Sequence, residues 1–342
     1  MMPKIHAAFA IPPLAALDAC LDVIIQPHEQ RIIQEIAAAD GSDGASMDVA
    51  ALYRRGILDI AGEPESAYTA PRYKLADFYT RLEVFVITEH DAWRRLPRAV
   101  RQEIDAWYFD AYYSRLAISA ETPPTEDAVF TLDETLAFID RETRQPYLAP
   151  CDCRSLANEL YGPSCGKPLE VCISFKNGPN TGAHRGITKP ITKDTAKEVV
   201  MQADRAGLIH RVNPGTICNC CIDCCYLSRA QRRRNEAIDF YNDPRAAAWP
   251  VQTQQVRLDP SSCVQCGQCI ERCPLKLFSI EDGVPHNDTS RCIGCGLCVT
   301  TCPSGALVLE AAGALRGASG RLLSPFSIEG GRHARFRRER RP

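Results

Sequence analysis

Two groups of four cysteines toward the C-terminal end carry the most specific chemical signal in the sequence. Within each group the cysteines are separated by two, two and three residues, and a proline follows the last one. Each cysteine of the second group lies 29 residues after its counterpart in the first, which indicates an internal duplication. Such spacings are those of metal ligands, which need free thiols and a reducing compartment. The groups are Cys263, Cys266, Cys269 and Cys273 before Pro274, and Cys292, Cys295, Cys298 and Cys302 before Pro303.

The spacing also predicts which cysteines share a metal centre. The run C-x2-C-x2-C-x3-C-P is typical of bacterial iron–sulfur sites, where the fourth cysteine binds the other cluster. Three thiolates so close in sequence reach three corners of one cubane only if the loop is tight, and Gly267 and Gly296 allow that close approach. The fourth cysteine lies too far along the next helical turn to close the same cube. We therefore predict cluster one at Cys263, Cys266, Cys269 and Cys302, and cluster two at Cys292, Cys295, Cys298 and Cys273.

This stretch resembles the bacterial-type 2[4Fe–4S] dicluster ferredoxin domain over residues 252–311, and all eight ligand positions follow the pattern. The resemblance implies two [4Fe–4S] clusters, a strand–helix–strand unit repeated twice, and transfer of single electrons between redox partner proteins. Zinc is the alternative, because zinc ribbons also use C-x2-C pairs. Zinc sites, however, use two separated pairs rather than triplets that each lead to C-P.

A second set of nine cysteines lies upstream of the duplicated groups. Adjacent pairs such as Cys220-Cys221 and Cys224-Cys225 are not explained as ordinary core residues. We favour one or two additional iron–sulfur clusters here. The alternatives are a zinc site that uses four of the nine, and redox-active dithiols, for which C-x2-C at Cys221 and Cys224 is suited. The candidate ligands are Cys151, Cys153, Cys165, Cys172, Cys218, Cys220, Cys221, Cys224 and Cys225.

The order C-x-C-R, C, C, then C-N-C-C-x2-C-C over residues 150–310 resembles a Cys-rich accessory domain of multi-cluster ferredoxin-type proteins of anaerobic bacteria. If two cubanes form, Cys151, Cys153, Cys165 and Cys172 are one candidate set, and four of the five later cysteines are the other. A mixed set is an equal alternative. His184 and His210 lie close in sequence to these cysteines, and we interpret them as ordinary histidines rather than ligands.

The N-terminal third has the pattern of a winged helix: helices, then a turn-linked pair of short strands near residues 56–75, then a longer helix over 97–116. A DNA-binding domain would place basic residues on the recognition helix and wing. The candidate helix offers only Arg54 and Arg55, and the wing carries Glu63 and Glu65. We therefore predict a protein-docking or structural role, and nucleic acid is not an expected partner.

The predicted fold class is α+β in five parts. These are a helical, winged-helix-like domain at 1–120, a linker at 121–150, a Cys-rich metal or redox domain at 151–250, the ferredoxin domain at 251–311, and a disordered basic tail at 312–342. In the linker, Thr131 and Glu134 indicate a capping box. In the Cys-rich domain, Thr192 and Gly207 bound a predicted helix.

Composition limits the remaining function classes. The chain has 342 residues and a formal net charge of −2, so no global field favours nucleic acid or an anionic membrane. No apolar run is long enough for a membrane helix, although docking on a membrane complex stays open, and the expected location is the cytoplasm. No P-loop or dinucleotide fingerprint is present. We predict an electron carrier or oxidoreductase subunit rather than a stand-alone enzyme. The alternatives are a reductase or reductive activator centred on the middle cysteines, and an iron–sulfur-sensing regulator.

Overall fold

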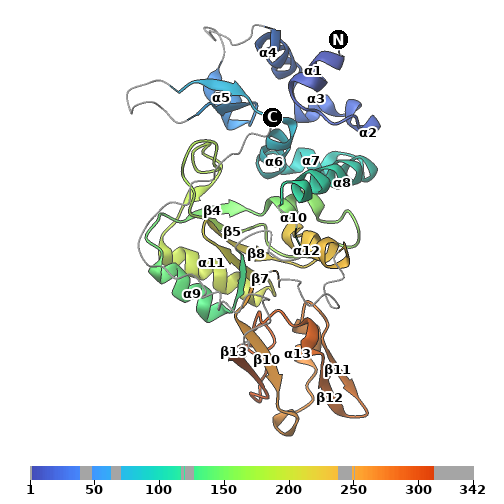
Figure 1. The fold of residues 1–342 in the computed structure, drawn as a ribbon, viewed down its shortest axis with the longest axis vertical. Helices are drawn as coiled ribbons and strands as arrows, with labels where there is room; N and C mark the ends of the chain where they lie inside the picture. The colour runs from blue at the N-terminus through green and yellow to red at the C-terminus, as the bar shows by residue number, and fades with distance from the viewer. Residues whose placement is uncertain are drawn as a thin grey trace.

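The computed structural model describes residues 2–38, 48–62, 71–116, 119, 127–237, 249 and 251–311. Three parts follow one another along the long axis of the molecule: N-terminal helices, a central sheet, and a smaller C-terminal unit (Figure 1). The fold is therefore of the mixed α+β kind. No helix in these ranges is both long and apolar enough to cross a membrane.

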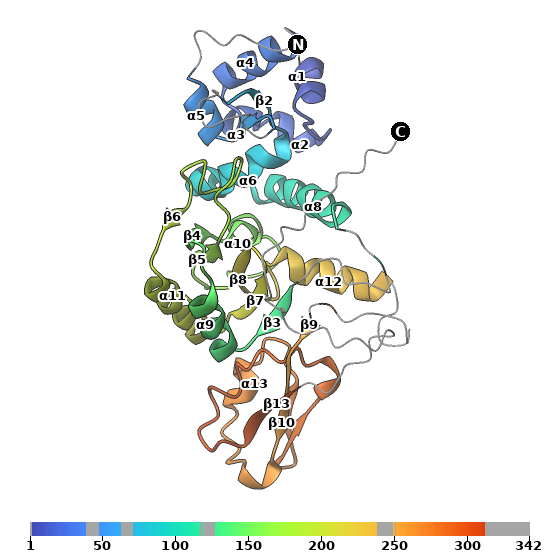
Figure 2. The same cartoon turned by 60° about the vertical axis from the view of Figure 1, so that its left-hand side comes forward.

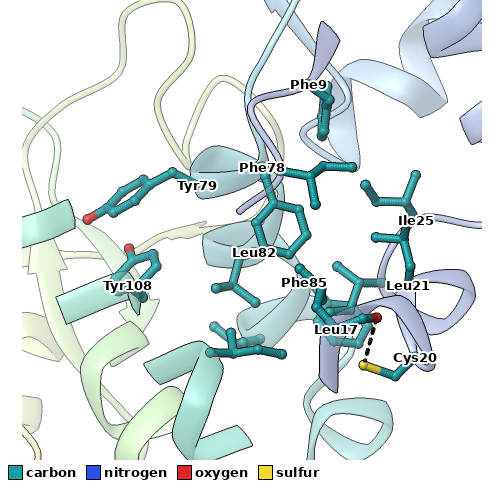
Figure 3. Packing of buried hydrophobic residues seen from close by; sticks show 14 of the residues in the cluster. Phe9, Leu17, Cys20, Leu21, Ile25, Phe78, Tyr79, Leu82, Phe85 and Tyr108 are labelled. Atoms are coloured by element: carbon teal, nitrogen blue, oxygen red, sulfur yellow. Dashed lines mark hydrogen bonds between the residues drawn. The ribbon is translucent and has the colours of Figure 1, made fainter. Parts of the chain in front are cut away.

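The N-terminal part is mainly helical. Its core contains Phe9, Leu21, Phe78 and Phe85, which converge from three segments of the chain (Figure 3). A small antiparallel pair of strands, β1 and β2, completes it. The elements are α1 (Met2–Ala8), α2 (Ala15–Asp18), α3 (Leu21–Ile24), α4 (Pro27–Ala38), α5 (Val49–Arg54), β1 (Leu58–Ile60), β2 (Tyr73–Leu75), α6 (Phe78–Thr88), α7 (His90–Arg95) and α8 (Arg98–Ser114).

The central part is built on a seven-stranded sheet with the order β6-β4-β5-β8-β7-β3-β9. All its strand pairs are antiparallel except β3 with β9. Helices α9 and α11 lie side by side against this sheet (Figure 1). The strands are β3 (Ala128–Phe130), β4 (Tyr147–Pro150), β5 (Glu170–Ser174), β6 (Lys189–Pro190), β7 (Ile209–Asn213), β8 (Thr216–Cys220) and β9 (Val251–Gln252), and the helices are α9 (Leu132–Arg141), α10 (Asp152–Ala157), α11 (Lys193–Arg205) and α12 (Tyr226–Ala237).

The prediction of a linker over 121–150 is wrong for its described part. Residues 128–150 supply β3, α9 and β4, and β3 lies between β7 and β9 inside the sheet. The capping box within this stretch is confirmed, since Thr131 accepts a hydrogen bond from the Glu134 amide and the Glu134 carboxylate accepts one from the Thr131 amide. The predicted helix after Thr192 is also confirmed, with Thr192 as its N-cap and Gly207 in the left-handed conformation beyond its end.

The C-terminal unit lies at the far end of the sheet from the N-terminal helices (Figure 2). Strand β10 (Gln254–Leu258) pairs with β13 (Leu307–Ala311), and β11 (Phe278–Glu281) pairs with β12 (Val284–Asn287) through a turn at Asp282 and Gly283. Helix α13 (Gln268–Arg272) follows the first cysteine triplet, with short 3-10 turns at η1 (Pro260–Ser262) and η2 (Thr289–Arg291). A second helix was predicted after the second triplet, but residues 297–301 form hydrogen-bonded turns.

Candidate metal centres

The eight cysteines of the C-terminal unit gather around two hollows. Each hollow receives three cysteines from one sequence group and the fourth cysteine of the other group. We call them the inner hollow, whose lining residue Leu297 packs against Val129 and Ile209 of the central sheet, and the outer hollow. The inner hollow is lined by Cys273, Cys292, Cys295 and Cys298, and the outer hollow by Cys263, Cys266, Cys269 and Cys302.

The sequence duplication is repeated in the loop geometry. Asp259 accepts a hydrogen bond from the Ser261 amide at 3.0 Å, and Asp288, 29 residues later, accepts one from the Ser290 amide at 2.9 Å. These Asx-type caps lead into the two triplets. The amide of Gln265 donates to Cys263 Sγ at 3.4 Å, and its counterpart at position 294 donates to Cys292 Sγ at 3.4 Å. Both loops thus turn backbone N–H groups toward sulfur.

Gly294 shows how tightly the inner loop is built. Its φ is +69°, and a Cβ at this position would lie 1.9 Å from the carbonyl oxygen of Gln254. Gly267 and Gly296 also have positive φ, +74° and +76°, but a Cβ at Gly267 would meet nothing within 4 Å. The glycine of these loops that is packed most tightly against protein backbone is therefore Gly294, whereas the close approach predicted for Gly267 and Gly296 concerns the cluster and stays a prediction.

The donor set of each hollow fits a cubane. A [4Fe–4S] cluster takes one thiolate at each of four irons, so its protein sulfurs must be further apart than the ligands of a single ion. Among the described residues, none of the eight cysteines joins a set of three ligand atoms within 4.8 Å of one another. Burial raises the pKa of Cys295 to about 12, so iron binding rather than the protein environment must ionise this thiol.

The nine upstream cysteines divide into six and three. Six of them form what we call the thiol ring, in which the pKa of each thiol is shifted by two neighbouring thiols. The Cys225 and Cys220 sulfurs, for example, are 3.2 Å apart. β8 places Cys218 and Cys220 on the same face because side chains alternate along a strand. In order around the ring the six are Cys151, Cys153, Cys225, Cys220, Cys218 and Cys172.

The other three form a separate group, which we call the thiol trio. Ligand atoms of Cys165, Cys221, Cys224 and the neighbouring Asp223 all lie within 4.8 Å of one another. The candidate set Cys151, Cys153, Cys165 and Cys172 is therefore not the set that the structure brings together, because Cys165 joins the trio. The arrangement is a mixed one, and it depends on the pairing of β4 with β5 and of β5 with β8.

Buried arginines set the electrostatics of these thiols. Arg154 is fully buried and extends one N–H group to Cys221 Sγ at 3.6 Å. Burial lowers the pKa of Arg154, but the thiolate forms of Cys151 and Cys221 raise it by more, so its pKa is raised overall. Hydrogen bonds from Cys153 and Cys172 lower the pKa of Cys151, and the lowered pKa favours the thiolate form that binds metal.

Neither histidine belongs to a thiol group. His184 Nδ1 lies 2.9 Å from the Tyr53 hydroxyl, in contact with the N-terminal part. His210 is buried on β7, where Nδ1 meets Asn219 Oδ1 at 2.6 Å and Nε2 lies 3.6 Å from Asp204. The structure therefore agrees with the interpretation of both as ordinary histidines.

The inner hollow adjoins the Cys-rich region. Cys295 of the hollow and Ile222, between two members of the trio, both pack against a buried set of Val129, Ile209 and Leu297. At the outer hollow, by contrast, Cys266 is exposed and Val264 is 64% exposed. The sequence did not predict the shared packing of Cys295 and Ile222, because it joins segments far apart in the chain.

Comparison with known families agrees with the geometry of the C-terminal unit. Residues 255–303 match the family model described as a 4Fe-4S dicluster domain. No curated protein matches the chain. The C-terminal unit is accordingly a 4Fe-4S dicluster domain, and the cofactors of this protein are [4Fe–4S] clusters.

Proposed function

We propose that this chain is an electron-transfer protein, or the electron-transfer subunit of a redox complex, that links a partner protein at its outer hollow to a redox centre in the Cys-rich region. The proposed ligand sets are the crossed ones: Cys263, Cys266, Cys269 and Cys302 in the outer hollow, and Cys273, Cys292, Cys295 and Cys298 in the inner hollow. When bound, each [4Fe–4S] cluster supplies a one-electron couple tuned by charge, hydrogen bonds to sulfur and solvent exposure.

The observation that carries this proposal is the shared packing of Cys295 and Ile222. A ligand of the inner hollow and a residue of the Cys-rich turn rest on the same buried side chains, which excludes water from the space between them. Ile209 of this buried set is also paired with the ring member Cys220 across β7 and β8, so the contact favours an electron path from the inner hollow to the thiol ring.

The two hollows also differ in solvent exposure, and the difference favours approach of a partner protein to the outer hollow. Cys273 and Cys298 in the inner hollow are 7% and 6% exposed, whereas Cys266 in the outer hollow is exposed. Val264 beside it is one of the few large apolar side chains that face solvent. An exposed apolar residue next to a redox site is suited to brief contact with a partner protein.

The thiol ring is the proposed site of one further iron–sulfur cluster. Its six sulfurs meet as neighbours, yet among the described residues no three of them lie within 4.8 Å of one another. The sulfurs around the ring are therefore spaced more widely than the ligands of a single tetrahedral ion. The ring is buried beside Arg211, whose positive charge lowers the pKa of Cys225 after the larger effect of the neighbouring Cys153 thiol.

The proposal is tested by counting iron and sulfide in the anaerobically purified full-length chain. A dicluster domain with a cluster at the ring holds about twelve iron and about twelve sulfide per chain. A value of about eight for each would show that the ring holds no cluster and would leave a simple carrier. If the ring holds a cluster, EPR during reductive titration of the wild type should show a signal in addition to those of the dicluster domain. Cys172→Ser should remove this additional signal and leave the dicluster signals.

The winged-helix-like N-terminal part is proposed to dock a protein rather than DNA. Arg55, the C-cap residue of α5, binds Glu29 at 3.2 Å and Glu89 at 2.9 Å, so one of the two basic residues at the candidate recognition helix is already neutralised. Failure of the full-length protein to shift DNA at low salt, in both oxidised and reduced states, is the expected result. A salt-sensitive shift would instead favour the iron–sulfur-sensing regulator.

A further inference from the structure

The thiol trio differs from every other cysteine group in the chain. Cys221 and Cys224 are buried, Cys165 is half-buried and Asp223 is exposed, and their ligand atoms lie within 4.8 Å of one another. Around a tetrahedral Zn²⁺ with Zn–S bonds of about 2.3 Å, neighbouring sulfurs lie about 3.8 Å apart. The trio and its carboxylate therefore have the spacing of ligands around one ion.

The dicluster hollows provide an internal comparison. Each hollow is lined by four thiols, and none of those thiols belongs to a compact set in the described part of the chain. The cysteine sulfurs around each dicluster hollow are therefore further apart than those of the trio. This contrast argues against a third cubane at Cys165, Cys221 and Cys224.

The surrounding backbone fixes both halves of the trio. Asn158 Oδ1 accepts a hydrogen bond from the Cys165 amide at 3.0 Å, and Gly166 has a φ of +62°. On the other side, Arg232 donates to the Ile222 carbonyl at 2.5 Å. Each of the two loops is thus fixed by its own hydrogen bond. The thiols are the groups through which one loop meets the other.

A buried guanidinium completes the site. Arg154 donates to the Pro168 carbonyl at 2.6 Å and extends Nη2 to Cys221 Sγ at 3.6 Å. Its Nε is buried and has no hydrogen-bond partner among the described residues. A positive side chain against the sulfur favours the thiolate form, and thiolates are the species that bind metal.

We propose that Cys165, Cys221, Cys224 and Asp223 bind a single Zn²⁺ ion in an S3O set. Binding releases the thiol protons to solvent and involves no change of oxidation state. The ion cross-links the loop at Cys165 to the turn at 221–224. It thereby holds Ile222 on the buried set that Cys295 also contacts. The proposal does not depend on the electron-transfer function, because a structural ion would be needed even if the dicluster domain served another purpose.

The test uses the full-length chain, produced with iron and zinc both supplied and purified without oxygen. We expect about one zinc per chain in addition to iron, with X-ray absorption showing three sulfur neighbours at about 2.3 Å and one lighter neighbour. Cys165→Ser should remove the zinc and leave iron and sulfide unchanged. Cys20→Ser is the matched control, since Cys20 is buried in the N-terminal core and bonds only local carbonyls, at 3.4 and 3.6 Å.

Three results would overturn the zinc site. Loss of about four iron and four sulfide in Cys165→Ser would identify a cubane. A zinc-free, folded wild type, or iron with sulfur neighbours in place of zinc, would also refute it, as would a disulfide between Cys221 and Cys224. If Cys165→Ser does not fold, Asp223→Asn serves instead, because Asp223 is exposed; its zinc should be lost to a chelator at least tenfold faster than that of the wild type.

Discussion

The guanidinium of Arg272, one residue before the inner-hollow ligand Cys273, lies 3.3 Å from the carboxylate of Asp204 at the end of α11. The same side chain donates to the Arg205 carbonyl at 2.8 Å. Both partners are largely buried, with side-chain exposures of 18% and 8%. A single arginine therefore ties the dicluster domain to the central sheet directly beside the inner hollow.

Arg272→Ala should weaken this junction. Removal of the guanidinium leaves the buried Asp204 carboxylate and the Arg205 carbonyl with fewer partners, at a cost of about 1–3 kcal/mol in the free energy of unfolding. Chemical denaturation of the reconstituted protein measures this change. The control is Arg257→Ala, which removes an exposed ion pair with Glu310 in the same domain and should leave stability unchanged. Equal effects of the two substitutions would show that Arg272 has no special role.

Gly294→Ala should prevent assembly of the inner cluster while the outer one still forms. The added Cβ would lie 1.9 Å from the Gln254 carbonyl, which forces the loop before Cys295 away from β10. Gly283→Ala is the matched control, because its Cβ meets nothing within 4 Å, it lines neither hollow, and only the left-handed φ is penalised, by roughly 1–2 kcal/mol. We expect about four iron to be lost in the first variant and none in the second. Similar iron content in both would refute the steric argument.

Cys273→Ser should perturb the cluster site of the second cysteine group rather than its own. Cys273 lines the same hollow as Cys292, Cys295 and Cys298, although it belongs to the first group in the sequence. Cys302→Ser is the reciprocal variant and should change the outer site. EPR or Mössbauer spectra of the two variants, compared with those of Cys295→Ser, distinguish the sites. If Cys273→Ser resembled Cys266→Ser instead, the crossed ligand sets would be wrong.

The sequence predicted the dicluster domain well because its signals are local. The spacing of its cysteines acts over a few residues, as does the capping box at Thr131 and Glu134 in the central part, and the structure contains both. The 29-residue duplication also includes the caps at Asp259 and Asp288. The repeat in the sequence would have predicted these caps, but they were not predicted.

The central sheet was missed for a physical reason. β3 is buried at all three of its residues and β7 at four of five, so neither shows the alternation that marks a half-buried strand. Prolines at positions 146 and 150 also suggested a linker, although Pro150 only ends β4. The division of nine thiols into ring and trio depends on strand pairing between distant segments, which spacing alone does not determine.

Asp105→Ala should destabilise the contact between the N-terminal helices and the thiol ring. Asp105 on α8 is fully buried and accepts hydrogen bonds from the hydroxyls of Tyr226 at 2.5 Å and Tyr161 at 2.7 Å, and from Arg229 at 3.0 Å. Tyr226 directly follows the ring member Cys225. Truncation leaves the largely buried Arg229 without its carboxylate, which costs about 3–5 kcal/mol in unfolding free energy.

The same variant should loosen the ring itself, because Tyr226 loses the bond that fixes the start of α12. We expect faster oxidation of the ring thiols or loss of iron from this site, measured against the dicluster iron in the same sample. Asp110→Ala is the control, since Asp110 lies one turn further along α8 and forms only an exposed ion pair with Arg233. A variant that unfolds more readily yet keeps the ring's reactivity unchanged would show that Asp105 stabilises the helices alone, and that the N-terminal part does not support the metal centre.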